Sequence, residues 1–372
     1  MTKYRFGDIV REVKEKVDRS NNPYEYFIAG DHMDTDELHL LRRGSFKDSD
    51  VGPAFIRIFR PGQVLYGSRR TYLRKVAVAN FEGVTANTTF VLESKDESVL
   101  LQRLLPFIMQ SDRFVQHSIK RSKGSTNPYV LFTDLADYEI NLPNVEKQKE
   151  LADLLWTLDD VKMSYKRLIS ATNDLVKSQF IEQIEGHYSE IALGDEIETT
   201  SGGTPSRKKS EYYDEGDIPW LTSGEVNRGI INSVNAFITK LGLENSSAKW
   251  VPAGSVVIAM YGATAGAVGL LEVPTTTNQA VCSLLPSEKF DPFYLYQAVC
   301  QKREWMIAST NGAAQPNISQ TIIKKMRISK PPMEVQKSFS EIVRQSDKSK
   351  FTFPMVLRYT HYGYSKLSNY VA

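Results

Sequence analysis

Hydrophobic and polar residues follow two different patterns along this chain. In residues 1–143 and 187–332, short runs of β-branched and aromatic residues alternate with Gly, Pro and Asn, which predicts short strands joined by turns, with some helix. After Pro143, apolar residues recur at alternating steps of three and four, which predicts a helix with one continuous apolar stripe. The stripe consists of Leu151, Leu154, Leu158, Val161, Tyr165, Leu168, Thr172 and Leu175.

The helix that carries this stripe is predicted to begin at Asn144, whose side chain is a good N-cap, with Glu146 in the first turn. Roughly forty residues at 1.5 Å per residue give a rod of about 60 Å. Packing within a bundle is the ordinary alternative for an amphipathic helix. The length of the stripe favours a coiled coil, in which a partner helix covers the apolar seam.

The sequence repeats itself once. Residues 124–160 align without a gap with residues 312–348, which lie 188 positions later. Residues 59–70 likewise parallel 251–262 at a slightly larger offset. The clearest matches are Pro128 with Pro316, Gln148 with Gln336 and Asp159 with Asp347. We therefore predict an α+β protein in which one unit is duplicated.

Four segments follow from the repeat. The two copies of the α+β unit occupy 1–143 and 187–332, and the central helical spacer occupies 144–186. The last segment, 333–372, is a second and shorter helical spacer with an irregular tail, because Pro354 should end its helix. We expect the two spacers to lie antiparallel and to separate the two units.

Composition narrows the class of protein. The 372 residues have a net charge of +2, so a site for a polyanion has to arise from local clustering of charge. Cys282 and Cys300 are too few for a disulfide framework or a zinc site, and the first twenty residues lack the apolar core of a signal peptide, which favours the cytoplasm. The uncharged segment 250–271 is rich in glycine and is predicted to form buried strands, so we expect no membrane span.

Basic and carboxamide side chains provide candidate contacts to nucleic acid. Six basic residues and no acid lie between Asp50 and Glu82: Arg57, Arg60, Arg69, Arg70, Arg74 and Lys75. Such a run is more often a solvated face than a binding patch, but aromatic residues are interleaved with it, as in surfaces that contact phosphates. Asn127, Gln315 and Asn317 are candidates to read base edges, with turn formation as the alternative.

The sequence contains little that suggests catalysis. It has no Walker A motif and no His-Glu-x-x-His motif, and its five histidines are dispersed. We therefore expect the chain to bind and position, with the chemistry in other subunits. A self-contained DNA methyltransferase or nuclease is the rival hypothesis, and a coiled-coil scaffold without DNA affinity is a third.

Four stretches resemble a known family. Residues 201–226, 238–271, 277–286 and 311–319 closely resemble the target recognition domain of specificity subunits from Type I restriction-modification systems. The first unit resembles a more divergent recognition domain. The helices that open with PNVEKQKELADLL and PPMEVQKSFSEIV are similar to the two spacer regions of that family, so the resemblance spans nearly the whole chain.

The resemblance implies a non-catalytic subunit with two target recognition domains and two coiled-coil spacers. Such a subunit binds an asymmetric, two-part site on double-stranded DNA. The resemblance also implies two methylation subunits that carry S-adenosylmethionine, and restriction subunits that use ATP and Mg. No cofactor is therefore expected in this chain. The shortened second spacer departs from the family pattern, which leaves a truncated or silent specificity subunit as an alternative.

Site residues follow from the same resemblance. In the second unit, DNA contact is expected from Ser201, Gly202, Gly203, Thr204, Pro205, Tyr261, Gly262, Thr277, Asn278, Gln279, Gly312, Gln315 and Asn317. In the first unit, the matching residues are Arg69, Arg70, Tyr72, Asn87, Gly124, Ser125 and Asn127. The apolar stripe of the central helix is the expected partner-binding surface.

Overall fold

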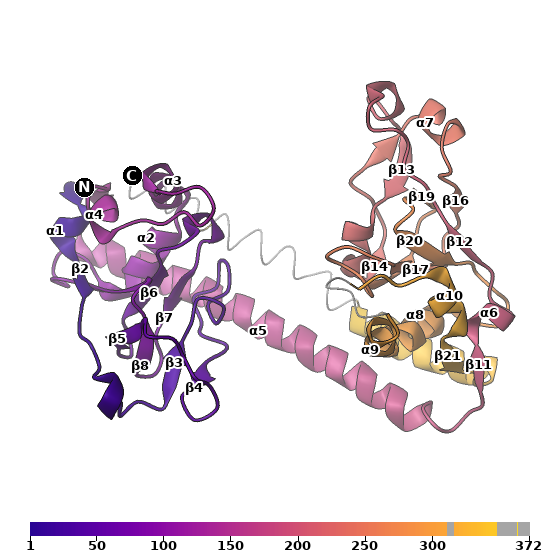
Figure 1. Cartoon of the computed structure of the whole chain (residues 1–372), viewed down its shortest axis with the longest axis horizontal. Coiled ribbons are helices and arrows are strands. Elements are labelled where there is room, and N and C mark those ends of the chain that lie inside the picture. The colour runs from indigo at the N-terminus through magenta and orange to yellow at the C-terminus, as the bar shows by residue number, and fades with distance from the viewer. Residues whose placement is uncertain (311–315, 348–362, 364–372) are drawn as a thin grey trace. The chain divides into compact units, whose positions relative to one another are not determined.

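The structure, a computed structural model, describes residues 1–310, 316–347 and 363. The chain forms two compact units, whose described residues are Met1–Tyr165 with Gly363 for the first and 166–310 with 316–347 for the second (Figure 1). Each unit combines helices with short strands, as the sequence predicts. The expected end of the second spacer at Pro354 lies outside the described residues, as do Gly312 and Gln315.

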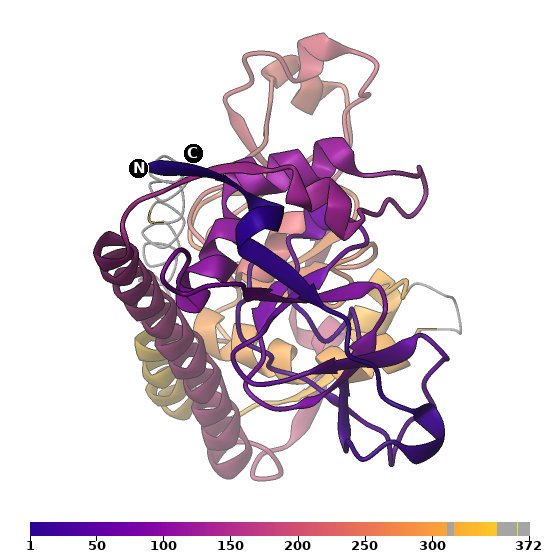
Figure 2. The same cartoon turned by 90° about the vertical axis from the view of Figure 1, so that its left-hand side faces the viewer.

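The first unit contains two four-stranded sheets and a two-stranded ribbon (Figure 2). One sheet, called the larger sheet because its strands hold more residues, is antiparallel. Its order is β2 (Val10–Val13), β9 (Thr89–Ser94), β6 (Val64–Gly67) and β7 (Val76–Val78). The smaller sheet has the order β4 (Gly44–Ser45), β3 (Tyr26–Ile28), β8 (Gly83–Ala86) and β5 (Phe55–Phe59), with β3 and β8 parallel. The ribbon pairs β1 (Thr2–Arg5) with β10 (Glu139–Leu142).

Short helices complete the first unit. They are α1 (Phe6–Ile9), η1 (Arg19–Asn21), η2 (Thr71–Leu73), η3 (Gln102–Leu104), α2 (Leu105–Gln110), α3 (Asp112–Arg121) and α4 (Phe132–Ala136). Helices and the small sheet cover opposite faces of the larger sheet, because successive side chains of a strand point to opposite sides. On β6, Val64 and Tyr66 pack in the cluster formed with α2 and α3, whereas Leu65 packs against β3 and β5.

The second unit repeats this topology, with a fifth strand added at one edge of its larger sheet. Its larger sheet has the order β12 (Thr199–Ser201), β20 (Val281–Leu284), β17 (Val256–Ala259), β18 (Val268–Leu271) and β14 (Ile230–Ile231). Its smaller sheet has the order β15 (Phe237–Ile238), β13 (Ile218–Leu221), β19 (Thr275–Thr277) and β16 (Trp250–Val251), with β13 and β19 parallel. The ribbon pairs β11 (Glu190–Ala192) with β21 (Arg327–Ser329). The duplication inferred from sequence is therefore confirmed in the strand order.

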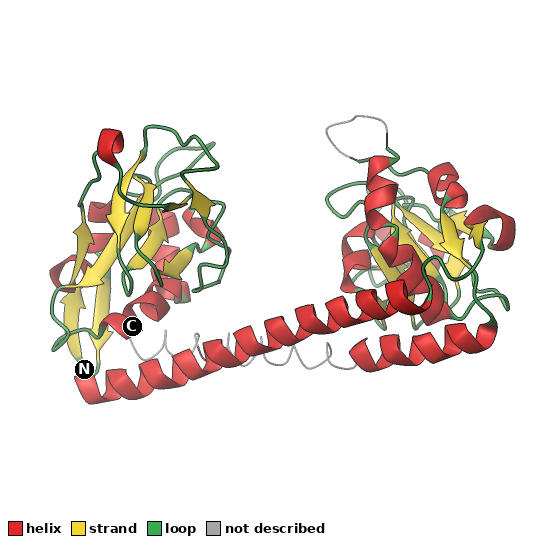
Figure 3. Cartoon of the chain, turned by 90° about the horizontal axis from the view of Figure 1, so that it is seen from below, coloured by secondary structure: helices red, strands yellow, loops and turns green. Residues whose placement is uncertain are grey.

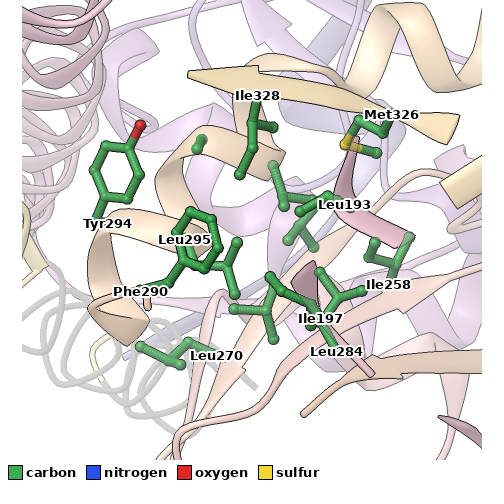
Figure 4. Packing of buried hydrophobic residues seen from close by; sticks show 14 of the residues in the cluster. Leu193, Ile197, Ile258, Leu270, Leu284, Phe290, Tyr294, Leu295, Met326 and Ile328 are labelled. Carbon is green, nitrogen blue, oxygen red and sulfur yellow. The ribbon is translucent and has the colours of Figure 1, made fainter. Parts of the chain in front are cut away.

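The helices of the second unit are α6 (Leu193–Glu196), η4 (Ser210–Tyr212), η5 (Ser223–Arg228), α7 (Lys240–Glu244), α8 (Pro292–Gln301), α9 (Arg303–Ala308) and α10 (Gln320–Lys325), followed by a helix over 333–347. Four of these α-helices correspond to those of the first unit, α6 to α1, α8 to α2, α9 to α3 and α10 to α4. Figure 4 shows the core that α6, α8 and β21 form over the sheet, with Leu193, Ile258 and Leu295 inside it. The hydroxyl of buried Tyr294 donates to the carbonyl oxygen of Ser329 at 2.7 Å, which ties α8 to the ribbon.

The predicted long helix is present as α5 (Val145–Gln183), an uninterrupted helix of 39 residues (Figure 3). Asn144 caps it, because its Oδ1 accepts a hydrogen bond from the backbone N–H of Lys147 at 3.0 Å. The beginning of α5 packs in the first core through Ala152 and Leu155. Its end packs in the second core through Val176 and Phe180.

The apolar stripe of α5 lies largely outside these cores. Leu154, Val161, Leu168 and Leu175, which are seven residues apart, are exposed, with Leu154 at 58%. Leu151, Leu158, Tyr165 and Thr172, the alternate positions of the same stripe, are half-buried. Among the described residues, helical Gly363 lies against one position of the stripe, because a Cβ atom there would be 3.0 Å from Cδ1 of Leu158. The coiled coil as a whole remains a prediction.

The uncharged segment 250–271 forms the buried strands β17 and β18 joined by a turn, as predicted. Within the described part of the chain, no helix has the length and apolar character needed to cross a membrane.

Candidate nucleic-acid interface

In the first unit, three loops meet at one end of the larger sheet. The loop after β6 holds Arg69 and Arg70, and Arg70 N–H donates to the carbonyl oxygen of Pro128 at 2.6 Å. The N–H of Val130 donates to the carbonyl oxygen of Ser68 at 2.9 Å. These two backbone bonds join the arginine loop to the loop between α3 and α4.

The loop between α3 and α4 presents the predicted polar residues to solvent. Lys123 and Tyr129 exchange two backbone hydrogen bonds, at 2.8 and 2.9 Å, and so close the loop at its base. Gly124 has a φ of +88°, a conformation that glycine adopts without strain. Ser125 and Asn127 are exposed on the loop that this turn begins.

Asn87 belongs to the same group of loops. The turn between β8 and β9 is held by Ser68, whose N–H and hydroxyl both donate to the carbonyl oxygen of Thr88, at 3.0 and 2.7 Å. Asn87, the preceding residue, is exposed. Tyr72, on η2 in the arginine loop, is 53% exposed. The first unit therefore brings its predicted residues, from Arg69 to Asn127, into one region.

Only part of the basic run is available for an anion. Arg60 forms a bidentate pair with Glu15, at 2.6 and 2.7 Å, and this hydrogen bonding lowers the pKa of Glu15. Arg57 lies 3.5 Å from Glu12. Arg74 binds Asp36 and, at 2.8 Å, Asp112. Acids outside the run therefore pair with these three arginines, and the interpretation of the whole run as a phosphate-contacting face stays a prediction.

The second unit places its predicted residues in matching loops. The N–H of Ile318 donates to the carbonyl oxygen of Met260 at 2.7 Å, and the N–H of Met260 donates to that of Ala280 at 2.8 Å. Tyr261 and Gly262 begin the turn after β17, with Gly262 at a φ of +89°. The exposed residues beside these anchors are Gln279 and Asn317.

The loop 201–205 packs against the strand end at Thr277. Gly203 N–H donates to the carbonyl oxygen of Thr277 at 2.9 Å, and the hydroxyl of Thr204 hydrogen-bonds to Oε1 of Gln279. A Cβ atom at Gly202 would overlap that same carbonyl oxygen, and one at Gly203 would overlap Ser247. The two glycines are therefore needed for close packing.

Several of the predicted contact residues also pack within the unit, and their contact with DNA stays a prediction. The buried members are Gly202, Gly203, Pro205 and Thr277, and Oδ1 of half-buried Asn278 accepts the N–H of Ala280 at 3.1 Å. Ser201 is half-buried at the end of β12. The half-buried or exposed side chains Thr204, Tyr261, Gln279 and Asn317 remain the candidates for ligand contact, with the exposed Arg207 and Lys208 nearby in sequence.

Tyr129 is a further candidate for ligand contact that was not among the residues predicted from sequence. It is 40% exposed at the base of the polar loop and forms a β-bridge with Arg69. An aromatic residue beside a polar loop is a signal that could have identified it, because exposed aromatic side chains stack on bases.

The described residues contain one group with the spacing of metal ligands: Glu37, His39 and Asp159. His39 Nε2 donates to Asp159 Oδ2 at 2.7 Å, which raises the pKa of His39. Burial acts to raise the pKa of Asp159, but the hydrogen bond from His39 and the charge of Lys162 lower it overall. Buried Lys162 contacts Asp159 and lies 3.8 Å from Glu37. The Lys162 ammonium supplies the positive charge that a metal ion would otherwise bring. The four side chains therefore hold α5 against the rest of the first unit.

Comparison with known proteins adds independent evidence. Residues 12–171 and 186–353 match the family described as Type I restriction modification DNA specificity domain. The specificity subunit of the Type I restriction enzyme HindI from Haemophilus influenzae is 22% identical over 89% of this chain and 90% of its own length. The EcoR124I/EcoR124II specificity subunit of Escherichia coli is 27% identical over 46% of this chain, and that alignment spans only 44% of the relative.

Among solved structures, the Type I restriction-modification S subunit from M. genitalium has a TM-score of 0.60. The alignment covers 98% of this chain and 95% of that protein, at 15% identity, and therefore shows a shared fold.

Proposed function

Since this chain belongs to the family of Type I restriction modification DNA specificity domains, we propose that it binds an asymmetric, two-part site on double-stranded DNA, one half through each unit. Membership of this family also confirms the expectation of a recognition subunit without catalytic activity of its own. The rival of a self-contained methyltransferase or nuclease is set aside.

The observation that carries the proposal is the repetition of one strand order with different side chains in the matched loops. Asn87 lies in the turn between β8 and β9, and Gln279 lies in the matching turn between β19 and β20. In the turn after β6, Arg69 of the first unit corresponds to Tyr261 of the second. Carboxamides and arginine hydrogen-bond to different base edges, so two equivalent folds with different loops read different sequences.

The exposed apolar stripe of α5 indicates where partner subunits bind. We place the two methylation subunits on this surface, which consists of Leu151, Leu154, Leu158, Val161, Tyr165, Leu168 and Leu175. Leucine and valine spaced seven residues apart are suited to a partner helix. S-adenosylmethionine, ATP and Mg are then bound by the methylation and restriction subunits, and the complex works in the cytoplasm.

The spacing of the two half-sites is a further part of the proposal. An uninterrupted helix of 39 residues is about 58 Å long at 1.5 Å per residue, a length that suits the predicted role of a spacer between two DNA-reading units. Half-sites held in fixed phase are expected about one helical turn of DNA apart, roughly 34 Å.

Sequencing of methylated adenines in cells with and without this gene tests the proposal. The expected result is a two-part motif, interrupted by a fixed number of unread base pairs, that disappears when the gene is deleted. A contiguous motif, or methylation that does not depend on the gene, would refute the two-part site. The purified chain, incubated alone with labelled S-adenosylmethionine and DNA, should transfer no methyl group.

A further inference from the structure

The turn after β6 and the turn after β17 correspond residue by residue. Val64 pairs with Val78 across the first hairpin, and Val256 pairs with Leu270 across the second, so both turns have the same length. Each residue of the first turn thus matches the residue 192 positions later. The backbone hydrogen bonds that hold the two turns agree as well. The carbonyl oxygen of Ser68 accepts one from the loop before α4, and that of Met260 accepts one from the loop before α10.

Both turns use the left-handed backbone conformation at the same two positions. In the second unit these positions are Gly262 and Gly266, with φ of +89° and +78°. In the first unit they are Arg70 and Arg74, with φ of +50° and +51°. Glycine enters this region freely, whereas a residue with a Cβ does so at a cost in free energy. The first unit therefore has arginine at two positions where the turn favours glycine.

The strain at Arg74 is offset within the chain. Its guanidinium binds Asp36 and Asp112, and donates to the carbonyl oxygen of Gln110 at 2.6 Å. The side chain is 19% exposed and links the arginine loop to α2 and α3. Arg74 thus has a structural reason to be an arginine.

Arg70 has no such reason among the described residues. Its backbone is fixed by the 2.6 Å bond from its N–H to Pro128 and by the N–H of Leu73, which donates to its carbonyl oxygen at 2.8 Å. Its side chain is exposed, and no ion pair or side-chain hydrogen bond of Arg70 occurs in residues 1–310 and 316–347. Strained residues of this kind collect at binding sites, where a ligand makes use of them.

We propose that Arg70 binds a DNA phosphate in the first half-site and that the second half-site, with Gly262, lacks this contact. The proposal rests on the DNA-binding function proposed above. A phosphate suits the site because a guanidinium without a carboxylate partner forms charge-assisted hydrogen bonds to its oxygens. Arg69 and Lys120 are exposed in the same region and add positive charge.

The test compares three full-length proteins: the wild type, Arg70→Gly and Arg70→Lys. Binding to a duplex with the complete two-part site is measured by fluorescence anisotropy at several salt concentrations. Arg70→Gly should bind about tenfold more weakly for all sequences, and its log–log salt slope should fall by about one. Arg70→Lys should keep the slope, because the charge remains.

Unfolding in urea serves as the matched measurement of folding. Arg70→Gly should unfold at the same or a higher urea concentration than the wild type, because glycine removes the backbone strain. Equal affinity and equal slope for Arg70→Gly would overturn the inference, as would a loss confined to one base of the site, which would indicate base reading. Failure of the wild type to bind any duplex would instead refute the proposed function itself.

Discussion

Gln148 and Gln336, which are 188 residues apart, make the same set of hydrogen bonds in the two units. Each amide nitrogen donates to the carbonyl oxygen of the proline before its helix, Pro143 at 3.0 Å and Pro331 at 2.9 Å. Each also donates to a loop carbonyl, of Val99 or Lys289, while its Oε1 accepts a backbone N–H from the same loop. Each buried glutamine therefore fixes the start of a long helix to its unit.

Replacing either glutamine should destabilise its own unit. Gln148→Ala and Gln336→Ala each leave buried backbone groups without partners, which costs about 1–3 kcal/mol per group. Urea unfolding followed by circular dichroism measures the loss. Gln183→Ala, at an exposed position at the end of α5, is the control and should change stability by less than about 0.5 kcal/mol. Equal stability of all three variants would show that the bonds contribute nothing.

The pair of His39 and Asp159 should make stability depend on pH. Because the pKa of His39 is raised in the folded state, its contribution is complete below the unfolded value near 6.5 and is lost as the pH rises through the folded value. The charges that face the ring are Asp159 and Glu37, which raise its pKa, and Lys162, which lowers it. The pKa of Asp159 is lowered, so its contribution is lost only in acid, as the pH falls through its folded value.

Unfolding free energies at pH 6 and pH 9 test this relationship. The difference between the wild type and His39→Gln should be larger at pH 6, because glutamine keeps a donor but carries no charge. His187→Gln, at an exposed histidine, should show no such difference. A His39→Gln effect that is the same at both pH values would mean that the imidazole is not charged in the folded protein.

Asn87 and Gln279 should act on different half-sites. A carboxamide that makes a bidentate contact with adenine is worth about 1–3 kcal/mol of discrimination, so Asn87→Ala should relax base preference in one half and Gln279→Ala in the other. Binding to a set of duplexes with single base changes measures this, and Asn232→Ala, exposed elsewhere in the second unit, is the control. A uniform loss for all duplexes would indicate contact with the backbone of the DNA instead.

A charge on the apolar stripe of α5 should weaken partner binding at least tenfold without unfolding the chain. Leu168 is 51% exposed, so Leu168→Glu removes little burial within the described chain. Burial of a leucine in an interface is worth about 1.5–3 kcal/mol, enough for a tenfold or larger loss in binding. Co-purification with the methylation subunits measures the effect, and Ser170→Glu on another face of α5 is the control.

The unfolding free energy of Leu168→Glu distinguishes two explanations for the stripe. No change is expected if another subunit covers it. A loss above about 1 kcal/mol in the isolated chain would show that the chain itself covers Leu168 and would contradict the partner-binding role.

The sequence predicted features that depend on local pattern or on the repeat. The helix at Val145–Gln183 follows from its apolar period and from the cap at Asn144. The coarse fold class, α+β with two related domains, is confirmed by the strand orders.

Features that depend on distant pairing were not predictable. Arg60 and Arg74 looked free because their acids, Glu15 and Asp112, lie 45 and 38 residues away along the chain. The bond between His39 and Asp159 joins residues 120 positions apart, and no pattern in one sequence indicates it. Backbone strain at Arg70 was likewise invisible, because arginine by itself does not suggest a left-handed turn.

The close packing at Gly202 divides the loop that follows β12 into two parts. A larger residue there would push the main chain away from Thr277, so that end of the loop has almost no freedom to vary. Variation is better tolerated at exposed Arg207 and Lys208, and at the hydrogen-bonded pair of Thr204 and Gln279. If the chain reads DNA as proposed, a collection of variants randomised at those four sites alone is expected to select different base sequences while keeping the same architecture.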